Sequence, residues 1–237
     1  TNASDGIGIG TAVIVEEAEL IITRREVNDT EAEVQRFKGA LETTIAETQK
    51  MAEDLAARVG EKEAEIMQGH MMLLSDPMLT GEIENSIQND KVNSEFAIEN
   101  VCNMYADMFA SMGDELMQQR ATDMRDIKVR MQRTLMGLQS VDVSALPAGT
   151  ILVAKDLTPS MTAGINPANV TGIVTELGGR TSHSAILARA LEIPAVVAVN
   201  GLLDEVKDGD TVVLDGSAGE VYVNPEVEVK AAYEAKR

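Results

Sequence analysis

The segment with the strongest chemical character is "GGRTSHSAILARAL", residues 178–191. His183, one of the chain's two histidines, stands there at the point where an amphipathic helical pattern begins. The first amides of a helix lack partners within it and carry a partial positive charge. Two glycines let the backbone bend and approach a ligand closely, and polar neighbours follow them: Gly178, Gly179, Arg180, Thr181, Ser182 and Ser184. The pattern predicts an anion site around a nucleophilic nitrogen that can carry a phosphoryl group.

A plainer interpretation of the same residues is structural. His183 would then be a capping or half-buried side chain, and the glycines would only make a turn. Short glycine motifs are weak signals, so spacing alone leaves both interpretations open.

The composition limits the classes of protein. The chain has 237 residues, of which 44% are hydrophobic, enough for one large domain or two ordinary ones. We find no run of about 18 apolar residues and no signal-peptide pattern, so we expect neither a membrane span nor export. The single cysteine, Cys102, excludes an internal disulfide and suits the cytoplasm. A net charge of −19 disfavours nucleic acid and anionic membranes and favours a basic protein partner.

The middle of the chain, from about residue 28 to 136, shows apolar residues at helical spacing. Asp76–Pro77 and Gly113 mark breaks between helices, and long helices with short breaks predict an antiparallel bundle. Residues 29–136 carry 21 acidic and 11 basic side chains, a net charge of −10 that suits steering of a basic partner.

Methionines are concentrated in this helical region. Twelve of the thirteen fall between residues 51 and 136. Methionine adapts to irregular gaps, so we expect most of them in the core, with Met72 and Met78 as an apolar docking patch.

The flanking regions have strand character. "IGTAVIVEE" precedes the helices, and "TILVA", "VTGIVTE", "IPAVVAV", "DTVVLD" and "EVYVN" follow them, with helical "DLTPSMTAGI" and "SHSAILARAL" between. This alternation predicts an α/β layer that ends in a hairpin around Gly216–Gly219. The first strand cannot bury its faces alone, so it should join the later sheet. We therefore predict an α/β domain of residues 1–22 and 143–226, interrupted by a helical domain of residues 23–142, with residues 227–237 beginning a linker helix.

The histidine segment also resembles a known signature. "GGRTSHSAILARALEIPAVV" is similar to the phosphohistidine motif of phosphoenolpyruvate-utilising enzymes, which include Enzyme I of the sugar phosphotransferase system, pyruvate phosphate dikinase and phosphoenolpyruvate synthase. The resemblance implies that His183 carries the phosphoryl group on Nε2. The matching positions are Gly178, Gly179, Thr181, His183, Ser184, Ile186, Leu187, Ala188 and Arg189.

Other segments favour one branch of this family. The dikinase and the synthase place a nucleotide-binding domain before the phosphohistidine domain, and this chain shows no Walker-type loop. "GHMMLLSDPML" and "RATDMRDIKVRM" instead resemble the helical subdomain with which Enzyme I receives the phosphocarrier HPr. The resemblance spans nearly the whole chain. It implies the amino-terminal portion of Enzyme I, a phosphoenolpyruvate-protein phosphotransferase: a swivelling α/β phosphohistidine domain interrupted by an HPr-binding antiparallel helical bundle.

The resemblance also implies roles for individual residues. Thr162 matches the threonine that bonds Nδ1 of the active histidine; without the motif we would expect a hydroxyl bonded to its own helix backbone. Gly179, Arg180, Thr181, Ser182 and Ser184 would stabilise the phosphoryl group. The implied HPr-binding residues are His70, Met72, Leu73, Asp76, Phe109 and Arg120.

The implied activity is the first step of the sugar phosphotransferase system, from phosphoenolpyruvate to His183 and then to HPr. In the family, the phosphoenolpyruvate and Mg²⁺ site and the main dimer contact belong to a carboxy-terminal barrel, to which nothing here corresponds. We therefore expect a monomer without metal that does not charge itself from phosphoenolpyruvate, and a Mg²⁺-dependent homodimer at full length. Two rivals remain: a nitrogen-regulatory paralogue with an HPr-like partner, and an inert docking module.

Overall fold

The computed structural model describes residues 1–180 and 182–237. The chain forms two compact units. The sheet unit contains Thr1–Glu17 and Val141–Arg237, and the helical unit contains Ala18–Ser140. The boundaries lie at residues 17/18 and 140/141, whereas the prediction placed them at 22/23 and 142/143. The sheet unit also includes residues 227–237, which were expected to begin a linker helix.

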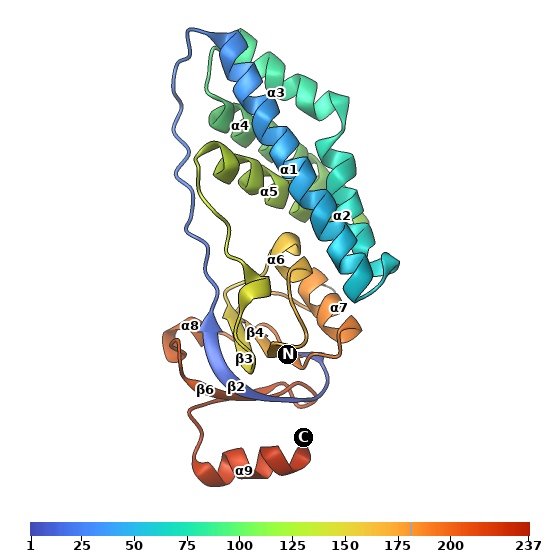
Figure 1. Ribbon diagram of the computed structural model, residues 1–237, viewed down its shortest axis with the longest axis vertical. Coiled ribbons are helices and arrows are strands. Elements are labelled where there is room, and N and C mark those ends of the chain that lie inside the picture. Colours follow the sequence, from blue (N-terminus) through green and yellow to red (C-terminus); the bar gives the residue numbers. More distant parts are fainter. Residues whose placement is uncertain (181) are drawn as a thin grey trace. The chain divides into compact units, whose positions relative to one another are not determined.

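The sheet unit is built on one mixed sheet of seven strands in the order β1-β5-β4-β3-β2-β6-β7 (Figure 1). The four strands β5, β4, β3 and β2 run parallel, and β1, β6 and β7 pair antiparallel to their neighbours. The bounds are β1 Asn2–Ser4, β2 Ile7–Ile14, β3 Thr150–Ala154, β4 Val170–Thr175, β5 Ala195–Val196, β6 Thr211–Asp215 and β7 Glu220–Val223.

The predicted role of the first long strand is confirmed, because β2 lies between β3 and β6. The strands approach closely there: a Cβ at Gly10 would overlap the carbonyl oxygen of Gly149. The predicted hairpin is confirmed as β6 and β7. Two elements were not predicted, β1 and the short helix α8, and "IPAVVAV" forms a strand only at Ala195–Val196.

Helices cover both faces of this sheet. Leu152 and Ala154 of β3 pack into the core beneath α6 (Pro159–Ala163) and α7 (His183–Ala190). Ile151 and Val153 alternate to the opposite face, where the core includes Leu202 of α8 (Leu202–Glu205). Such two-sided burial explains why β3 is an unbroken apolar run. A short 3₁₀ turn at Val143–Ala145 and the C-terminal helix α9 (Val227–Lys236) complete the unit.

The helical unit contains α1 (Thr30–Arg58), α2 (Glu61–Leu74), α3 (Pro77–Asp90), α4 (Ser94–Ser111) and α5 (Glu115–Leu135). The predicted breaks are confirmed. Asp76 caps α3 by accepting the amide of Met78, with Pro77 as the first helical residue. Gly113 follows the end of α4 and has a φ of +79°, which separates α4 from α5. One apolar core joins the helices around Phe37, Leu74, Ile83, Ile87, Ile98, Met124, Ile127 and Met131.

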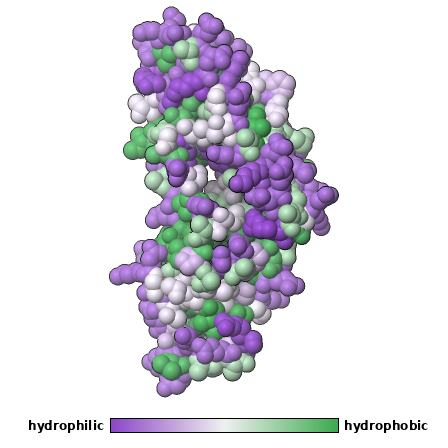
Figure 2. Space-filling model, viewed as in Figure 1, coloured by the Kyte–Doolittle hydropathy of each residue, from purple (hydrophilic) through white to green (hydrophobic). Residues whose placement is uncertain are grey.

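The expectation that most methionines lie in the core is wrong. Within the helical unit only Met67, Met124 and Met131 are buried. Six others are exposed: Met72, Met78, Met104, Met108, Met112 and Met136. In Figure 2 the visible face of the helical unit is mainly hydrophilic, with separate hydrophobic patches.

Among the described residues, no helix combines the length and apolar character needed to cross a membrane.

Candidate functional site

His183 is the first residue of α7. Helix α7 follows the carboxyl end of β4, and α6 follows the carboxyl end of the neighbouring parallel strand β3. Both helices therefore start at the same edge of the sheet, where open α/β sheets bind their ligands. The imidazole of His183 is half-buried, and its Nε2 atom is shielded from solvent.

Ser182 is the N-cap of α7. Its hydroxyl oxygen accepts the amide of Ala185 at 3.3 Å and donates to the carbonyl of Gly179 at 2.7 Å. The Oγ atom of Ser184, which is 3% exposed, lies 3.1 Å from the Oγ of Ser182. The Ser182 hydroxyl proton is thus used by the loop in this conformation, and its predicted bond to a phosphoryl group stays a prediction.

The two glycines before the helix have different reasons to be glycine. Gly178 has a φ of +99°, in the left-handed region where a side chain is strained. Gly179 has no such backbone, and a Cβ built on it meets none of the described atoms within 4 Å. Among the described residues, nothing therefore requires a glycine at 179.

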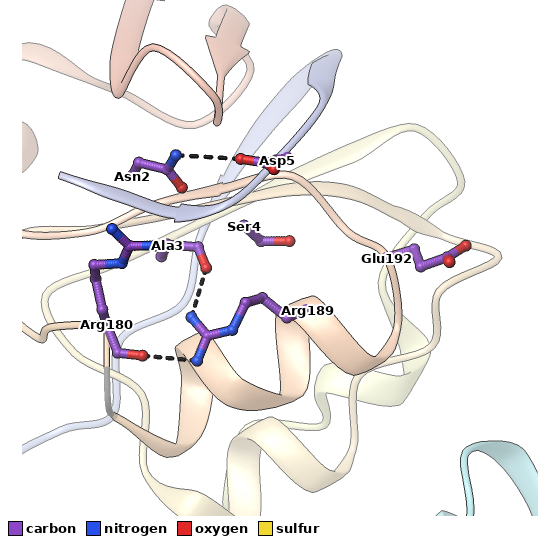
Figure 3. A pocket seen from close by; sticks show the side chains of 7 residues that line it. All are labelled: Asn2, Ala3, Ser4, Asp5, Arg180, Arg189 and Glu192. Atoms are coloured by element: carbon purple, nitrogen blue, oxygen red, sulfur yellow. Dashed lines mark hydrogen bonds between the residues drawn. The ribbon is translucent and has the colours of Figure 1, made fainter.

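Arg180 points toward the N-terminal strand. Figure 3 shows its side chain directed to β1, where it lines a cavity of about 300 Å³. The other lining residues are Asn2, Ala3, Ser4, Asp5, Arg189 and Glu192. The Arg180 side chain is exposed, and its predicted contact with a phosphoryl group on His183 stays a prediction.

Thr162 lies in α6 and is 2% exposed. Its hydroxyl donates to the carbonyl of Thr158 at 2.8 Å, which is the backbone alternative for this residue. A hydroxyl oxygen that has donated its proton can still accept another. The bond from Nδ1 of His183 to Thr162 therefore stays a prediction. Thr181 lies outside the described residues.

Two of the residues expected on the partner-facing surface are buried. His70 is 0% exposed and its Nε2 atom lies 2.9 Å from Oδ1 of Asp123 in α5. Leu73 is 8% exposed and belongs to the helical core. Both lie on the inner face of α2, so their side chains offer no contact surface. Met72, between them in sequence, is 67% exposed.

The remaining residues expected to contact the partner have intermediate exposure. Asp76, Phe109 and Arg120 are half-buried, and Phe109 packs against the core. Burial, together with the carboxylates of Glu82 and Asp76, raises the pKa of Tyr105. Helix α3 packs against α4.

Sequence reasoning missed a stripe on α4. Met104, Met108 and Met112 are 53%, 45% and 53% exposed, and residues four apart share a helix face. The signal was present in their spacing, but the same spacing also describes a buried stripe.

The described residues do not fit a metal site. They contain no group of three His, Cys, Asp or Glu side chains arranged to hold an ion. We therefore derive no step through Mg²⁺ from them.

His183 thus stands at a helix start, behind a glycine turn and at the carboxyl edge of a mixed sheet. Two family models match the chain. The model of the PEP-utilising enzyme N-terminal region matches residues 1–120, and the model of the PEP-utilising enzyme mobile domain matches residues 146–219. The chain belongs to this family of phosphoenolpyruvate-utilising enzymes and, within it, to the N-terminal portion of Enzyme I.

Similar curated proteins are named phosphoenolpyruvate-protein phosphotransferase. The chain is 41% identical to that of Staphylococcus carnosus, 44% to that of Listeria monocytogenes and 41% to that of Bacillus subtilis, over 98–99% of its own length. It spans 41% of the length of each of these relatives.

Two solved structures are similar. A solution structure of Enzyme I is 39% identical, with a TM-score of 0.86, covering 99% of this chain and 95% of that one. An N-terminal domain of the nitrogen-type Enzyme 1 is 27% identical, with a TM-score of 0.63, covering 99% and 96%.

Proposed function

We propose that this chain is the phosphoryl-transfer portion of a phosphoenolpyruvate-protein phosphotransferase, in which His183 accepts a phosphoryl group and passes it to HPr. The observation that carries the proposal is the position of His183 at the start of α7, behind the Gly178 turn. The match to relatives of that name over nearly the whole chain supports it.

In the forward reaction, the lone pair of His183 Nε2 attacks phosphorus, and the bond to the enol oxygen of phosphoenolpyruvate breaks. In the second step the phosphorus–nitrogen bond breaks as the active imidazole of HPr attacks. Both intermediates are phosphoramidates, so the protein mainly has to align the groups and stabilise charge. We assign the binding of phosphoenolpyruvate and of Mg²⁺ for the first step to the part of the relatives that this chain does not span, while His183 of this chain supplies the attacking nitrogen.

The residues of the sheet unit have distinct tasks in this scheme. The first-turn amides of α7 and its dipole face the doubly negative group. A proton held on Nδ1, with Thr162 as acceptor, leaves the lone pair on Nε2. Because Nε2 is shielded, the ring or the groups around it must move before Nε2 meets a phosphoryl donor.

We assign HPr docking to the exposed methionines of α2, α3 and α4, called the methionine surface: Met72, Met78, Met104, Met108 and Met112. This surface combines adaptable apolar groups with the acidic charge of the helices around it. A basic partner with an apolar rim fits both features.

A nitrogen-type role is the second candidate, supported by the similarity to the nitrogen-type N-terminal domain. Its lower identity and TM-score favour the sugar-type assignment. Competition between phosphorylated HPr and its nitrogen-type counterpart separates the two, since the preferred donor labels His183 faster.

The test uses HPr labelled with ³²P by a full-length phosphoenolpyruvate-protein phosphotransferase, then freed of that enzyme. We expect label on the wild-type chain and none on His183→Ala. Phosphoenolpyruvate alone should label neither. Equal labelling of the two chains would contradict the proposal by placing the label on another residue. No labelling of wild type by either phosphocarrier would contradict it and leave a docking module.

A further inference from the structure

Arg189 lies in the last turn of α7 and connects three segments of the sheet unit. One terminal nitrogen of its guanidinium donates to the carbonyl of Ala3 at 2.8 Å, and the other donates to the carbonyl of Arg180 at 2.8 Å (Figure 3). Ala3 belongs to β1, and Arg180 lies three residues before His183. A single side chain thus ties the helix of the histidine to the loop before it and to an edge strand.

The first part of the loop before the histidine is held by several hydrogen bonds: the amides of Glu176 and Leu177 donate to the carbonyls of Ala154 and Lys155. The carbonyl of Leu177 accepts from Thr175 and from the amide of Ala198, and the carbonyl of Gly179 accepts from Ser182. Among the described residues, Arg189 is the partner of the Arg180 carbonyl. Arg189 therefore fastens the loop at Arg180, and Ser182 fastens it at Gly179.

The two carbonyl acceptors favour arginine over lysine at position 189. A guanidinium presents planar, paired donors that can serve two acceptors at once, whereas an ammonium is a compact charge on a flexible stem. The two carbonyls come from different segments, and a planar fork holds both in a more fixed geometry than a rotating ammonium does. The cavity side of this fork also holds Asp5 and Glu192, which makes a free anion there a poorer explanation.

We propose that Arg189 is a positioning residue for phosphoryl transfer. This inference rests on the proposed function of His183. The fork holds the glycine loop against β1, and this keeps the loop and the start of α7 in the geometry that in-line transfer requires. Misplacement of reacting groups by about 1 Å can cost about 100-fold in rate, so loosening one fastening point should be visible in the turnover.

The experiment measures phosphoryl exchange between labelled phospho-HPr and the 237-residue chain for wild type, Arg189→Met and Arg189→Lys. Arg24→Lys, an exposed arginine of the helical unit, is the matched control. We expect kcat to fall about tenfold in Arg189→Met and nearly as far in Arg189→Lys, with an unchanged KM for phospho-HPr. The control should keep the wild-type kcat.

Three outcomes overturn the inference: a wild-type kcat in Arg189→Met, full rescue by lysine, which would make Arg189 a plain charge, or a loss that follows only the melting temperature. A wild-type chain that accepts no label would instead overturn the proposed function. The two failures are therefore distinguishable.

Discussion

The hydroxyl of Ser182 donates to the carbonyl of Gly179 at 2.7 Å while the same oxygen caps α7. The glycine turn and the helix that begins with His183 are therefore one hydrogen-bonded element. A change at Ser182 should affect both the stability of the helix and the placement of the histidine.

Ser182→Ala removes the cap, which costs about 1 kcal/mol of unfolding free energy. Ser182→Asp restores a good cap but cannot donate to Gly179, and it adds negative charge beside the phosphoryl group. We expect Ser182→Asp to unfold in urea close to wild type and yet to exchange phosphoryl more slowly than Ser182→Ala. An aspartate variant that exchanges faster than the alanine variant would contradict this reasoning.

Alanine at Gly178 should mainly lower stability, whereas alanine at Gly179 should mainly lower activity. Gly178→Ala places a side chain at a φ of +99° and should lower the unfolding free energy by about 1–2 kcal/mol. Gly179→Ala meets none of the described atoms within 4 Å, so we expect its unfolding curve to stay near wild type. Its methyl group takes room from the phosphoryl group, and exchange should fall about tenfold. A Gly179→Ala chain with normal exchange would mean that the space beside Gly179 is not used by the ligand.

The sequence predicted the helices and strands of the sheet unit better than the surface of the helical unit. A glycine pair before a helix leaves a direct local signature, and β3 is apolar because it is buried on both faces. Helical periodicity, by contrast, says which residues share a face but not which face is covered. Met104, Met108 and Met112 repeat like core residues and are exposed, while His70 is polar and fully buried.

The burial of His70 follows from a partner that is distant in sequence. Asp123 is 53 residues away, and no local pattern links the two. Similarly, β1 was not predicted because its three residues gain strand structure only by pairing with β5. Long-range pairing of this kind is absent from any short window of sequence.

His70 and Met72 should behave oppositely. His70→Ala removes a buried hydrogen-bond partner of Asp123 and should cost about 3 kcal/mol of unfolding free energy. Met72→Ala changes an exposed side chain and should cost less than about 0.5 kcal/mol, while weakening HPr binding measured by calorimetry. At a temperature where both variants are folded, a normal HPr affinity in Met72→Ala would remove Met72 from the methionine surface.

The helical unit should lose stability in mild acid through Glu95. Burial raises the pKa of Glu95, but the hydrogen bonds and charge of Arg36, at 2.7 and 3.2 Å, outweigh this and hold the pKa below its ordinary 4.5. A lowered folded-state pKa contributes stability that is present above the unfolded value of 4.5 and is lost as pH falls through the folded value.

Urea titrations followed by circular dichroism between pH 6 and pH 3 test this. We expect wild type to lose more unfolding free energy below about pH 4.5 than Glu95→Gln does, because the variant has no proton to bind at this position. Parallel curves for the two proteins would show that Glu95 makes no contribution to the acid sensitivity.

The central claim is that His183 carries the phosphoryl group on Nε2. The most direct measurement is the ¹⁵N and ³¹P NMR spectrum of the chain, with labelled histidines, after exchange with phospho-HPr. We predict a phosphorus–nitrogen coupling at Nε2 of His183, lost on acidification and absent in His183→Ala. A coupling at Nδ1, a signal at His70, or phosphate that survives acid would contradict the account.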